Sequence, residues 1–188
     1  MKKNAIVSVF DKIGFEKFRK LQEHGWNILS TGGTASALQK LDIPCTLIES
    51  ITEFPEMMDG RLKTLHPNVF GGILAKRDNP KHMEALKKYG MLEIDLVVIN
   101  LYPFMTSPSI ENIDVGGPSM LRAAAKNHEF VTAVCDPTDY DEVIDQFATT
   151  GQTSLTLRRA LAIKAFRLTS EFDDCVLNFL TDRQLNEA

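Results

Sequence analysis

Cysteine and histidine are scarce in this 188-residue sequence, and neither is arranged as a set that could form disulfides or bind a metal. The three cysteines, Cys45, Cys135 and Cys175, are odd in number and far apart, without a CxxC pair. The four histidines show no ligand spacing. A disulfide framework needs paired cysteines, and a zinc site needs closely spaced ligands. The sequence therefore predicts neither a disulfide scaffold nor a metal site.

Long apolar runs and an excess of positive charge are also missing. No apolar run approaches the roughly eighteen residues of a membrane helix, and the opening MKKNAIVSVFDK becomes charged too early for a signal peptide. We therefore expect a cytoplasmic protein that does not enter the membrane. The formal net charge is −4, whereas general nucleic-acid binding normally shows as a basic face. We expect no nucleic-acid partner, and any bound anion should occupy a local pocket.

What the sequence does have is an ordinary globular composition, with 44% hydrophobic and 24% charged residues. Its length suits one domain, residues 1–188. Short β-branched runs alternate with helical patterns, which favours an α/β fold with three layers and a mainly parallel, doubly wound sheet. Strands are expected at 4–10, 27–30, 45–49, 95–101 and 130–135, and helices at 15–24, 35–41, 118–127 and, as one helix or two in series, 154–180.

The segment STGGT, residues 30–34, ends a predicted strand and begins a helix. Glycines let the backbone curl around an anion, and the free N–H groups of a first helical turn point into the curl. Thr31 and Thr34 add hydroxyl donors. Ser8 and Lys12 would lie at the carboxyl edge of the neighbouring strand, where open α/β sheets bind ligands. The segment is thus a candidate phosphate cradle; a plain turn with a capping threonine is the alternative, and this motif alone does not decide.

The stretch GRLKTLHPNVFGG, residues 60–72, places several cationic side chains within a few positions of one another, although the chain as a whole is acidic. It begins in a segment with little periodicity, and long structureless segments in compact domains are usually functional or disordered. We expect Arg61, Lys63 and Thr64 to reach polar parts of an extended anion such as a nucleotide. The strand-like NVFGGIL that follows, residues 68–74, would hold the loop down. A solvated basic loop is the alternative interpretation.

Two further stretches are candidates for the reacting end of a substrate. NLYPF, residues 100–104, ends the most apolar strand, so Tyr102 could stack on a ligand or hydrogen-bond it; a rim tyrosine is the alternative. NIDVGGPSMLRAAAKN places Asp114 before a second glycine loop and Lys126 near the end of the following helix. A helix cap and a basic residue favourable to the helix C-terminus would explain the same pattern.

Taken in order, these segments resemble one known family. SVFDKIG, STGGT, EFPEMMDGRLKTLHPNVFGGIL, NLYPF and IDVGGPSMLRAAAKNH, followed by a TSLTLRRALAIKAF helix, resemble the inosine monophosphate (IMP) cyclohydrolase domain of the bifunctional purine biosynthesis protein. The resemblance covers essentially the whole chain and implies a methylglyoxal-synthase-like fold. It implies closure of the purine ring of 5-formamidoimidazole-4-carboxamide ribonucleotide (FAICAR) to IMP with loss of water, the last step of de novo purine biosynthesis. No cofactor and no metal are implied.

The resemblance also implies roles for individual residues. Substrate binding is implied for Ser8, Lys12, Thr31, Gly33, Thr34, Arg61, Thr64, Asn100, Val115 and Gly116. The implied catalytic candidates are Lys63, Tyr102, Asp114 and Lys126. A straight helix from Pro118 to Lys126 rises roughly 12 Å, so Asp114 and Lys126 meet only if the glycine loop folds back along it.

The chain departs from the family pattern at three places. Phe10 stands where the family usually has a serine, Phe70 where HPxVHGG would give a histidine, and the segment from Phe104 to Ile113 is shorter than usual. These differences affect substrate affinity and the rim of the site more than the chemistry. A phosphate-binding regulatory domain of the same fold and a methylglyoxal synthase are the alternative functions. NLYPF and IDVGGPSMLRAAAKN favour the cyclohydrolase over both.

Two expectations concern partners. In the bifunctional family a much larger transformylase region follows the TSLTLRRALAIKAF helix, whereas this sequence reaches Ala188 after the polar tail TDRQLNEA. We therefore expect no formyl transfer from this chain and a need for a separate transformylase polypeptide. The apolar stripes of residues 154–180 have surface to spare for a partner, so a homodimer is possible.

Overall fold

The computed structural model describes residues 2–187, and the side chains among them other than those of Asp59 and residues 184–187. A sheet of five parallel strands forms its centre, in the order β3-β2-β1-β4-β5. The α/β fold class predicted from the sequence is confirmed. The strands are β1 (Asn4–Val7), β2 (Asn27–Ser30), β3 (Thr46–Leu47), β4 (Leu96–Val98) and β5 (Thr132–Val134).

The winding of the chain changes direction beside β1. The chain runs outward from β1 through β2 to β3, then returns to place β4 on the other side of β1. The register aligns Val7 with Ser30 of β2 and with Val98 of β4, so the three strands end side by side. In an open parallel sheet, ligands bind outside the carboxyl ends of the strands at such a switch point.

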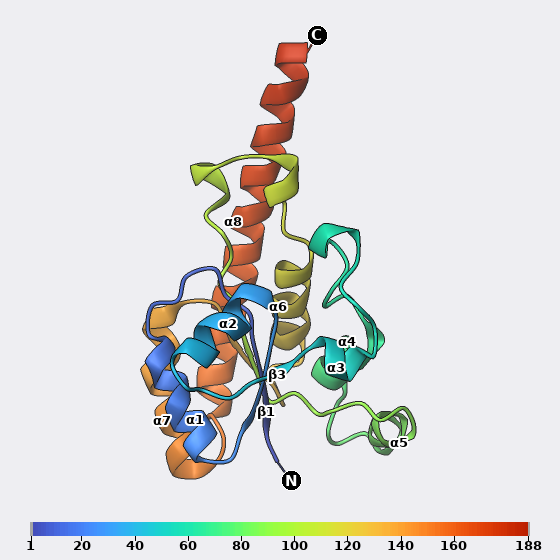
Figure 1. Ribbon diagram of the computed structural model, residues 1–188, viewed down its shortest axis with the longest axis vertical. Coiled ribbons are helices and arrows are strands. Elements are labelled where there is room, and N and C mark those ends of the chain that lie inside the picture. The colour runs from blue at the N-terminus through green and yellow to red at the C-terminus, as the bar shows by residue number, and fades with distance from the viewer. Residues whose placement is uncertain (1, 188) are drawn as a thin grey trace.

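Helices cover both faces of the sheet, because alternate residues of each buried strand point to opposite sides (Figure 1). Ala5 and Val7 face one core with α1, α2 and α7, whereas Ile6 faces a second core with α3, α4 and α6. The helices are α1 (Phe18–Glu23), α2 (Gly32–Lys40), α3 (Glu49–Thr52), α4 (Pro67–Leu74), α5 (Pro80–Lys88), α6 (Gly116–Lys126), α7 (Tyr140–Thr150) and α8 (Leu155–Glu187).

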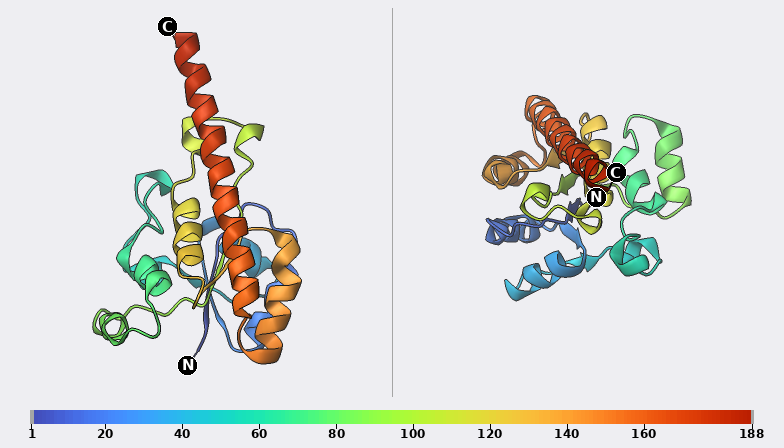
Figure 2. Two further views of the ribbon diagram at one scale, coloured as in Figure 1. Left: turned by 180° about the vertical axis from the view of Figure 1, so that it is seen from behind. Right: turned by 90° about the horizontal axis from the view of Figure 1, so that it is seen from above.

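Helix α8 is one continuous helix, which decides between the two possibilities that its sequence left open. Its first half packs on β5 and α6, and its second half extends beyond the sheet (Figures 1 and 2). The segment after β4 lies against this second half, where the ring of Phe104 is 5.8 Å from that of Phe172 and 5.4 Å from that of Phe179. Within residues 2–187, no helix is both long and apolar enough to cross a membrane.

The strand-like interpretation of residues 68–74 is wrong, because they form helix α4. Pro67 occupies the first helical turn, where its missing N–H costs nothing, and the His66 ring accepts a hydrogen bond from the Asn68 N–H at 3.1 Å. Val69 and Ile73 then bury one helical face. The four-residue spacing of these two side chains was the helical signal within an apolar run.

Some predicted elements differ in length from the observed ones, and some observed helices were not predicted. Strand β2 has the predicted bounds, the other four strands are shorter than predicted, and β3 has two residues before the chain turns into α3. Helices α5 and α7 have no counterpart among the predicted elements, although Asn79 before Pro80 is a recognisable start and caps Lys81 N at 3.0 Å. Short 3-10 turns complete the order: η1 (Phe15–Lys17), η2 (Met58–Gly60), η3 (Phe104–Thr106), η4 (Ile110–Asn112) and η5 (Pro137–Asp139).

Gly72 allows α4 to approach the chain that leads into β4. A Cβ at Gly72 would lie 2.1 Å from the carbonyl oxygen of Leu92, and the Ile94 N–H donates to the Gly72 carbonyl at 3.2 Å. We predict that Gly72→Ala lowers the free energy of unfolding by about 1–3 kcal/mol, because backbone must move to admit the methyl group. Thermal and urea unfolding measure this change.

Gly33→Ala is the matched control for that prediction. A Cβ at Gly33, in the first turn of α2, meets no described atom within 4 Å. Alanine is also the better helix former. Gly33→Ala should therefore leave stability unchanged or raise it slightly, and equal losses in both variants would contradict the packing argument.

Candidate functional site

The predicted phosphate cradle lies at the start of α2. Thr31 is the extended N-cap residue, and Gly32 takes a φ of +40°, a conformation that favours glycine. The N–H groups of Thr34 and Ala35 turn back to the Thr31 carbonyl at 3.0 and 3.1 Å. Gly32 and Gly33 are exposed in the first turn of this nine-residue helix. Backbone N–H groups and the positive end of the helix dipole therefore meet at one exposed place, which suits an anion.

The Thr34 hydroxyl does not have the role predicted for it. It accepts from Val9 N at 3.1 Å and donates to Val9 O at 3.0 Å, and Thr34 is only 5% exposed. This hydroxyl therefore ties the cradle to the end of β1 and is not directed at a ligand. The hydroxyls of Ser8 and Thr31, by contrast, lie 3.1 Å apart at the same edge of the sheet.

Asn100 holds the loop that follows β1. Its Oδ1 accepts from Phe10 N at 2.6 Å and Asp11 N at 2.9 Å, and its Nδ2 donates to Asp11 O at 3.0 Å. These three bonds use the side-chain oxygen and one of the two N–H groups of the amide that the family resemblance placed on the substrate. Asn100 thus positions the loop at the switch point between β1 and β4.

Lys12 folds back over that same loop. Its ammonium group donates to Val9 O at 2.7 Å and to Phe10 O at 2.6 Å. The Val9 carbonyl also accepts from Thr34, so Lys12 lies beside the cradle, as predicted. Partial burial lowers the pKa of Lys12, and the neighbouring Asp11 carboxylate opposes that shift. An anion in the cradle would stabilise the charged form of this ammonium group.

The segment carrying Lys63 and Thr64 lies between the two glycine loops. A Cβ at Gly32 would lie 3.1 Å from the Lys63 Nζ, and a Cβ at Gly116 would lie 2.9 Å from the Thr64 Oγ1. Adjacent residues therefore touch the start of α2 on one side and the start of α6 on the other. The starts of α2 and α6 are therefore joined through two adjacent residues of one segment.

Asp114 caps helix α6 from the loop before it. Its Oδ1 accepts from Gly117 N at 2.9 Å. A Cβ at Gly117 would lie 2.3 Å from the Asp114 Oδ2, so the carboxylate fits only because residue 117 is glycine. Burial raises the pKa of Asp114, and the hydrogen bonds from the Gly117 and Gly116 N–H groups partly oppose this. Val115 follows with its side chain 58% exposed beside the carboxylate.

Two acidic partners of the cations were not identified from the sequence. The Lys63 ammonium is paired with Glu56, and Arg61 is paired with Glu111 at 2.5 Å. An antiparallel bridge between Met57 and Leu62 places the residues just outside it, Glu56 and Lys63, opposite each other. Linear spacing gave no signal for this pairing, because it depends on the turn between the two segments.

Lys126 lies at the other end of α6 from Asp114. It is an exposed residue at the last turn of α6, whereas Asp114 caps the first. The eleven-residue helix is about 16 Å long, and the glycine loop does not fold back along it. Asp114 and Lys126 therefore lie at opposite ends of α6, and a role for Lys126 at the reacting end stays a prediction. Phe70 lies on α4 and packs against the second core, away from a rim position.

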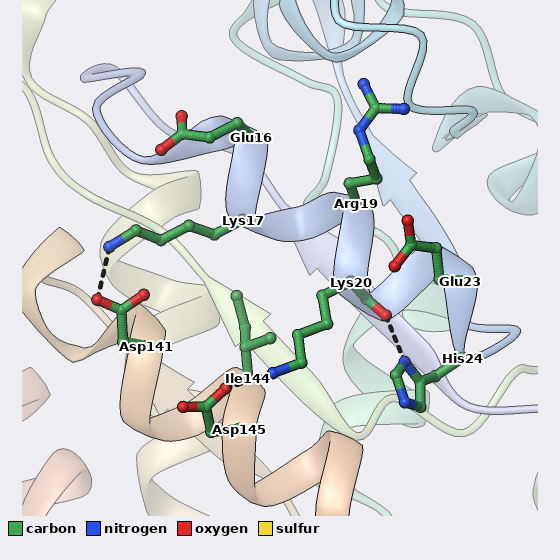
Figure 3. A pocket seen from close by; sticks show the side chains of 9 residues that line it. All are labelled: Glu16, Lys17, Arg19, Lys20, Glu23, His24, Asp141, Ile144 and Asp145. Atoms are coloured by element: carbon green, nitrogen blue, oxygen red, sulfur yellow. Dashed lines mark hydrogen bonds and ion pairs between the residues drawn. The ribbon is translucent and has the colours of Figure 1, made fainter.

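The site is distinct from a hollow between α1 and α7 (Figure 3). That hollow has a volume of about 430 Å³ and is lined by charged side chains. Its charges are largely compensated, because Lys17 pairs with Asp141 at 2.8 Å and Lys20 with Asp145 at 2.5 Å. None of the candidate site residues lines it. Among the described residues, no group of three or more His, Cys, Asp or Glu side chains could hold a metal ion.

Comparison with known proteins identifies relatives of the chain. Bifunctional purine biosynthesis protein PurH of Lactococcus lactis subsp. cremoris (strain SK11) is 50% identical over 191 residues, covering 97% of this chain and 37% of the relative. PurH of Streptococcus mutans serotype c is 49% identical, covering 96% and 37%. This chain thus spans 37% of the length of these PurH relatives.

A solved structure and two families match as well. The crystal structure of ForH superposes with a TM-score of 0.87 at 35% identity, covering 96% of this chain and 100% of that one. Residues 15–134 match the MGS-like domain family, and residues 124–188 match the AICARFT/IMPCHase bienzyme family. The chain therefore belongs to the MGS-like domain family, as the resemblance of its motifs predicted, and its C-terminal part matches the AICARFT/IMPCHase bienzyme model.

Proposed function

We propose that residues 1–188 form a single IMP cyclohydrolase domain, which closes FAICAR to IMP with loss of water. One observation carries the proposal. The segment of Lys63 and Thr64 bridges an anion cradle at the start of α2 and a carboxylate loop at the start of α6. A nucleotide needs both parts, because its phosphate and its reacting ring lie at opposite ends. The bifunctional PurH relatives support the same activity.

The chemistry is difficult because an amide nitrogen is a weak nucleophile. The carboxamide nitrogen attacks the formyl carbon, the formyl oxygen becomes an oxyanion, and a water molecule then leaves. Such a reaction needs a positioned base, hydrogen-bond donors at the oxyanion, and a substrate held in the attacking conformer. No redox step and no group from a second substrate are involved.

The described residues can meet these needs in the proposed site. Asp114 serves as the base, since burial raises its pKa and so makes it a better proton acceptor than an exposed carboxylate. Lys63 and the Tyr102 hydroxyl supply donors for the oxyanion. Gly32, Gly33 and Lys12 bind the phosphate, and Arg61 and Thr64 hold the nucleotide between these two ends. The Lys63 ammonium is paired with Glu56, a partner that the substrate would replace.

In this proposal, formyl transfer is carried out by a transformylase activity and not by residues 1–188. The region matched by this chain is 37% of the length of the bifunctional relative, so most of that relative lies outside the match. We propose that the matched region serves ring closure, with FAICAR supplied by a transformylase activity. The ring-closing protein would work in the cytoplasm on a small nucleotide, without metal or cofactor, and a homodimer would suit the exposed apolar residues of α8, such as Leu177 and Leu180.

The direct test of the proposed function is ring closure by the purified 188-residue chain. We expect FAICAR to be converted to IMP in a buffer containing a metal chelator, followed by absorbance and by chromatography of the product. Tight IMP binding without turnover would favour the regulatory domain. Formation of methylglyoxal from a triose phosphate, again without IMP, would favour the synthase.

Substitutions at the two ends of the site should separate binding from catalysis. Asp114→Ala removes the base, so it should lower kcat by a factor of about 10² or more with a smaller change in KM. Lys12→Ala removes a phosphate contact that ground and transition states share, so it should mainly raise KM. Lys63→Ala should change both constants, because its ammonium lies against the cradle. An unchanged kcat in Asp114→Ala would remove Asp114 from its role.

The pH profile of kcat/KM tests Asp114 by a different property. A base must be deprotonated, so activity should fall as pH drops through its pKa. Because burial raises this pKa, the acid limb should have its midpoint above the ordinary value of 3.8. Asp114→Asn should abolish the limb together with most of the activity. A wild-type profile that stays flat to below 3.8 would contradict the assignment.

A further inference from the structure

Phe10 and Tyr102 form an aromatic pair at the edge of the site. Their ring centroids are 4.4 Å apart, and the ring planes are inclined at 86°. Edge-to-face contact at this distance is a favourable arrangement of two aromatic quadrupoles. Phe10 nevertheless remains 53% exposed and belongs to neither hydrophobic core. Its ring therefore contributes little to the stability of the fold, and its contact with Tyr102 asks for another explanation.

The backbone of Phe10 is held at both of its polar groups. Its N–H donates to Asn100 Oδ1 at 2.6 Å, and its carbonyl accepts from Lys12 Nζ at 2.6 Å. The preceding residue, Val9, is bound at N–H and carbonyl by the Thr34 hydroxyl. The Lys12 ammonium also lies 5.9 Å from the centre of the Phe10 ring. The ring thus projects from a segment with little freedom to move.

Tyr102 lies on a much less constrained segment. It follows the end of β4 in a stretch without regular secondary structure, between half-buried Leu101 and exposed Pro103. Asn100, two residues earlier, is the last side chain of this stretch that is bonded to the β1 loop. The Phe10 ring is therefore the next point at which the rigid loop reaches the segment that carries the tyrosine.

We propose that Phe10 is a positioning residue, whose ring fixes the orientation of the Tyr102 ring and hence the direction of its hydroxyl in the site. The proposal rests on the proposed function for its catalytic consequence, but the ring contact itself does not. A serine at this position would be too short to make that contact. In this chain the tyrosine is thus held by an aromatic partner on the loop that follows β1.

The kinetic experiment is a double-mutant cycle on FAICAR closure. Phe10→Ser should lower kcat by about fivefold to tenfold with KM changed less than about twofold, the loss expected for one edge-to-face pair that serves to orient a donor. Phe10→Tyr keeps the ring and should restore kcat. In a Tyr102→Phe background, Phe10→Ser should have almost no effect, because no hydroxyl remains to be oriented.

Ile13→Ala is the matched control. Ile13 is an apolar side chain on the same loop and is 68% exposed, so its removal makes a similar change in surface. It should leave kcat, KM and the melting temperature unchanged. Equal losses from Phe10→Ser in the wild-type and Tyr102→Phe backgrounds would overturn the proposal, as would a kcat within twofold of wild type.

A spectroscopic measurement tests the ring contact without activity. The chain has three tyrosines, so 3-fluorotyrosine labelling gives three ¹⁹F resonances, and Tyr102→Phe assigns one. Phe10→Ser should shift and narrow the Tyr102 resonance and leave those of Tyr89 and Tyr140 in place. An unchanged Tyr102 resonance would overturn the proposal. If wild-type protein forms no IMP although this resonance responds, the proposed function fails while the positioning of Tyr102 by Phe10 stands.

Discussion

The parallel pairing of β1 with β2 on one side and β4 on the other is the constraint on which the site depends. It aligns Val7, Ser30 and Val98, so three strands end together at one edge of the sheet. A different segment follows each strand there: the Phe10 loop after β1, the start of α2 after β2, and the segment that carries Asn100 and Tyr102 after β4. Because the sheet is buried on both faces, a ligand would meet these three strands at their carboxyl ends.

Side chains at this edge mostly hold backbone in place. Thr34 satisfies both polar groups of Val9, and Asn100 bonds the N–H groups of Phe10 and Asp11. A buried or crowded backbone group without a partner is costly, so a loop at the end of a strand needs such bonds. Their consequence for function is pre-organisation, since the cradle and the Lys12 loop are held in position before a ligand arrives.

Charge at the site is balanced within the chain. Lys63 and Arg61 each pair with a glutamate, although both were expected to face a nucleotide. These pairs are partly exposed, so they contribute little to stability and exchange readily for a phosphate or a polar base. Asp114 is different, because it is half-buried against the start of α6 and its pKa is raised. The site thus combines exchangeable cations with one carboxylate whose basicity the fold sets.

The sequence by itself determined the fold class, the family and the segments that meet at the site, because periodicity and glycine-rich turns are local properties. The alternation of β-branched runs with helical patterns was enough to predict a parallel sheet, and its carboxyl edge was the expected place for a ligand. Only the tertiary structure decided which side chains face that edge. The side chains of Thr34 and Asn100 bond to backbone groups, and Glu56 pairs with Lys63. Lys126 lies at the far end of α6 from Asp114. Such outcomes depend on which unpaired groups become neighbours after folding, and a linear pattern carries no information on that.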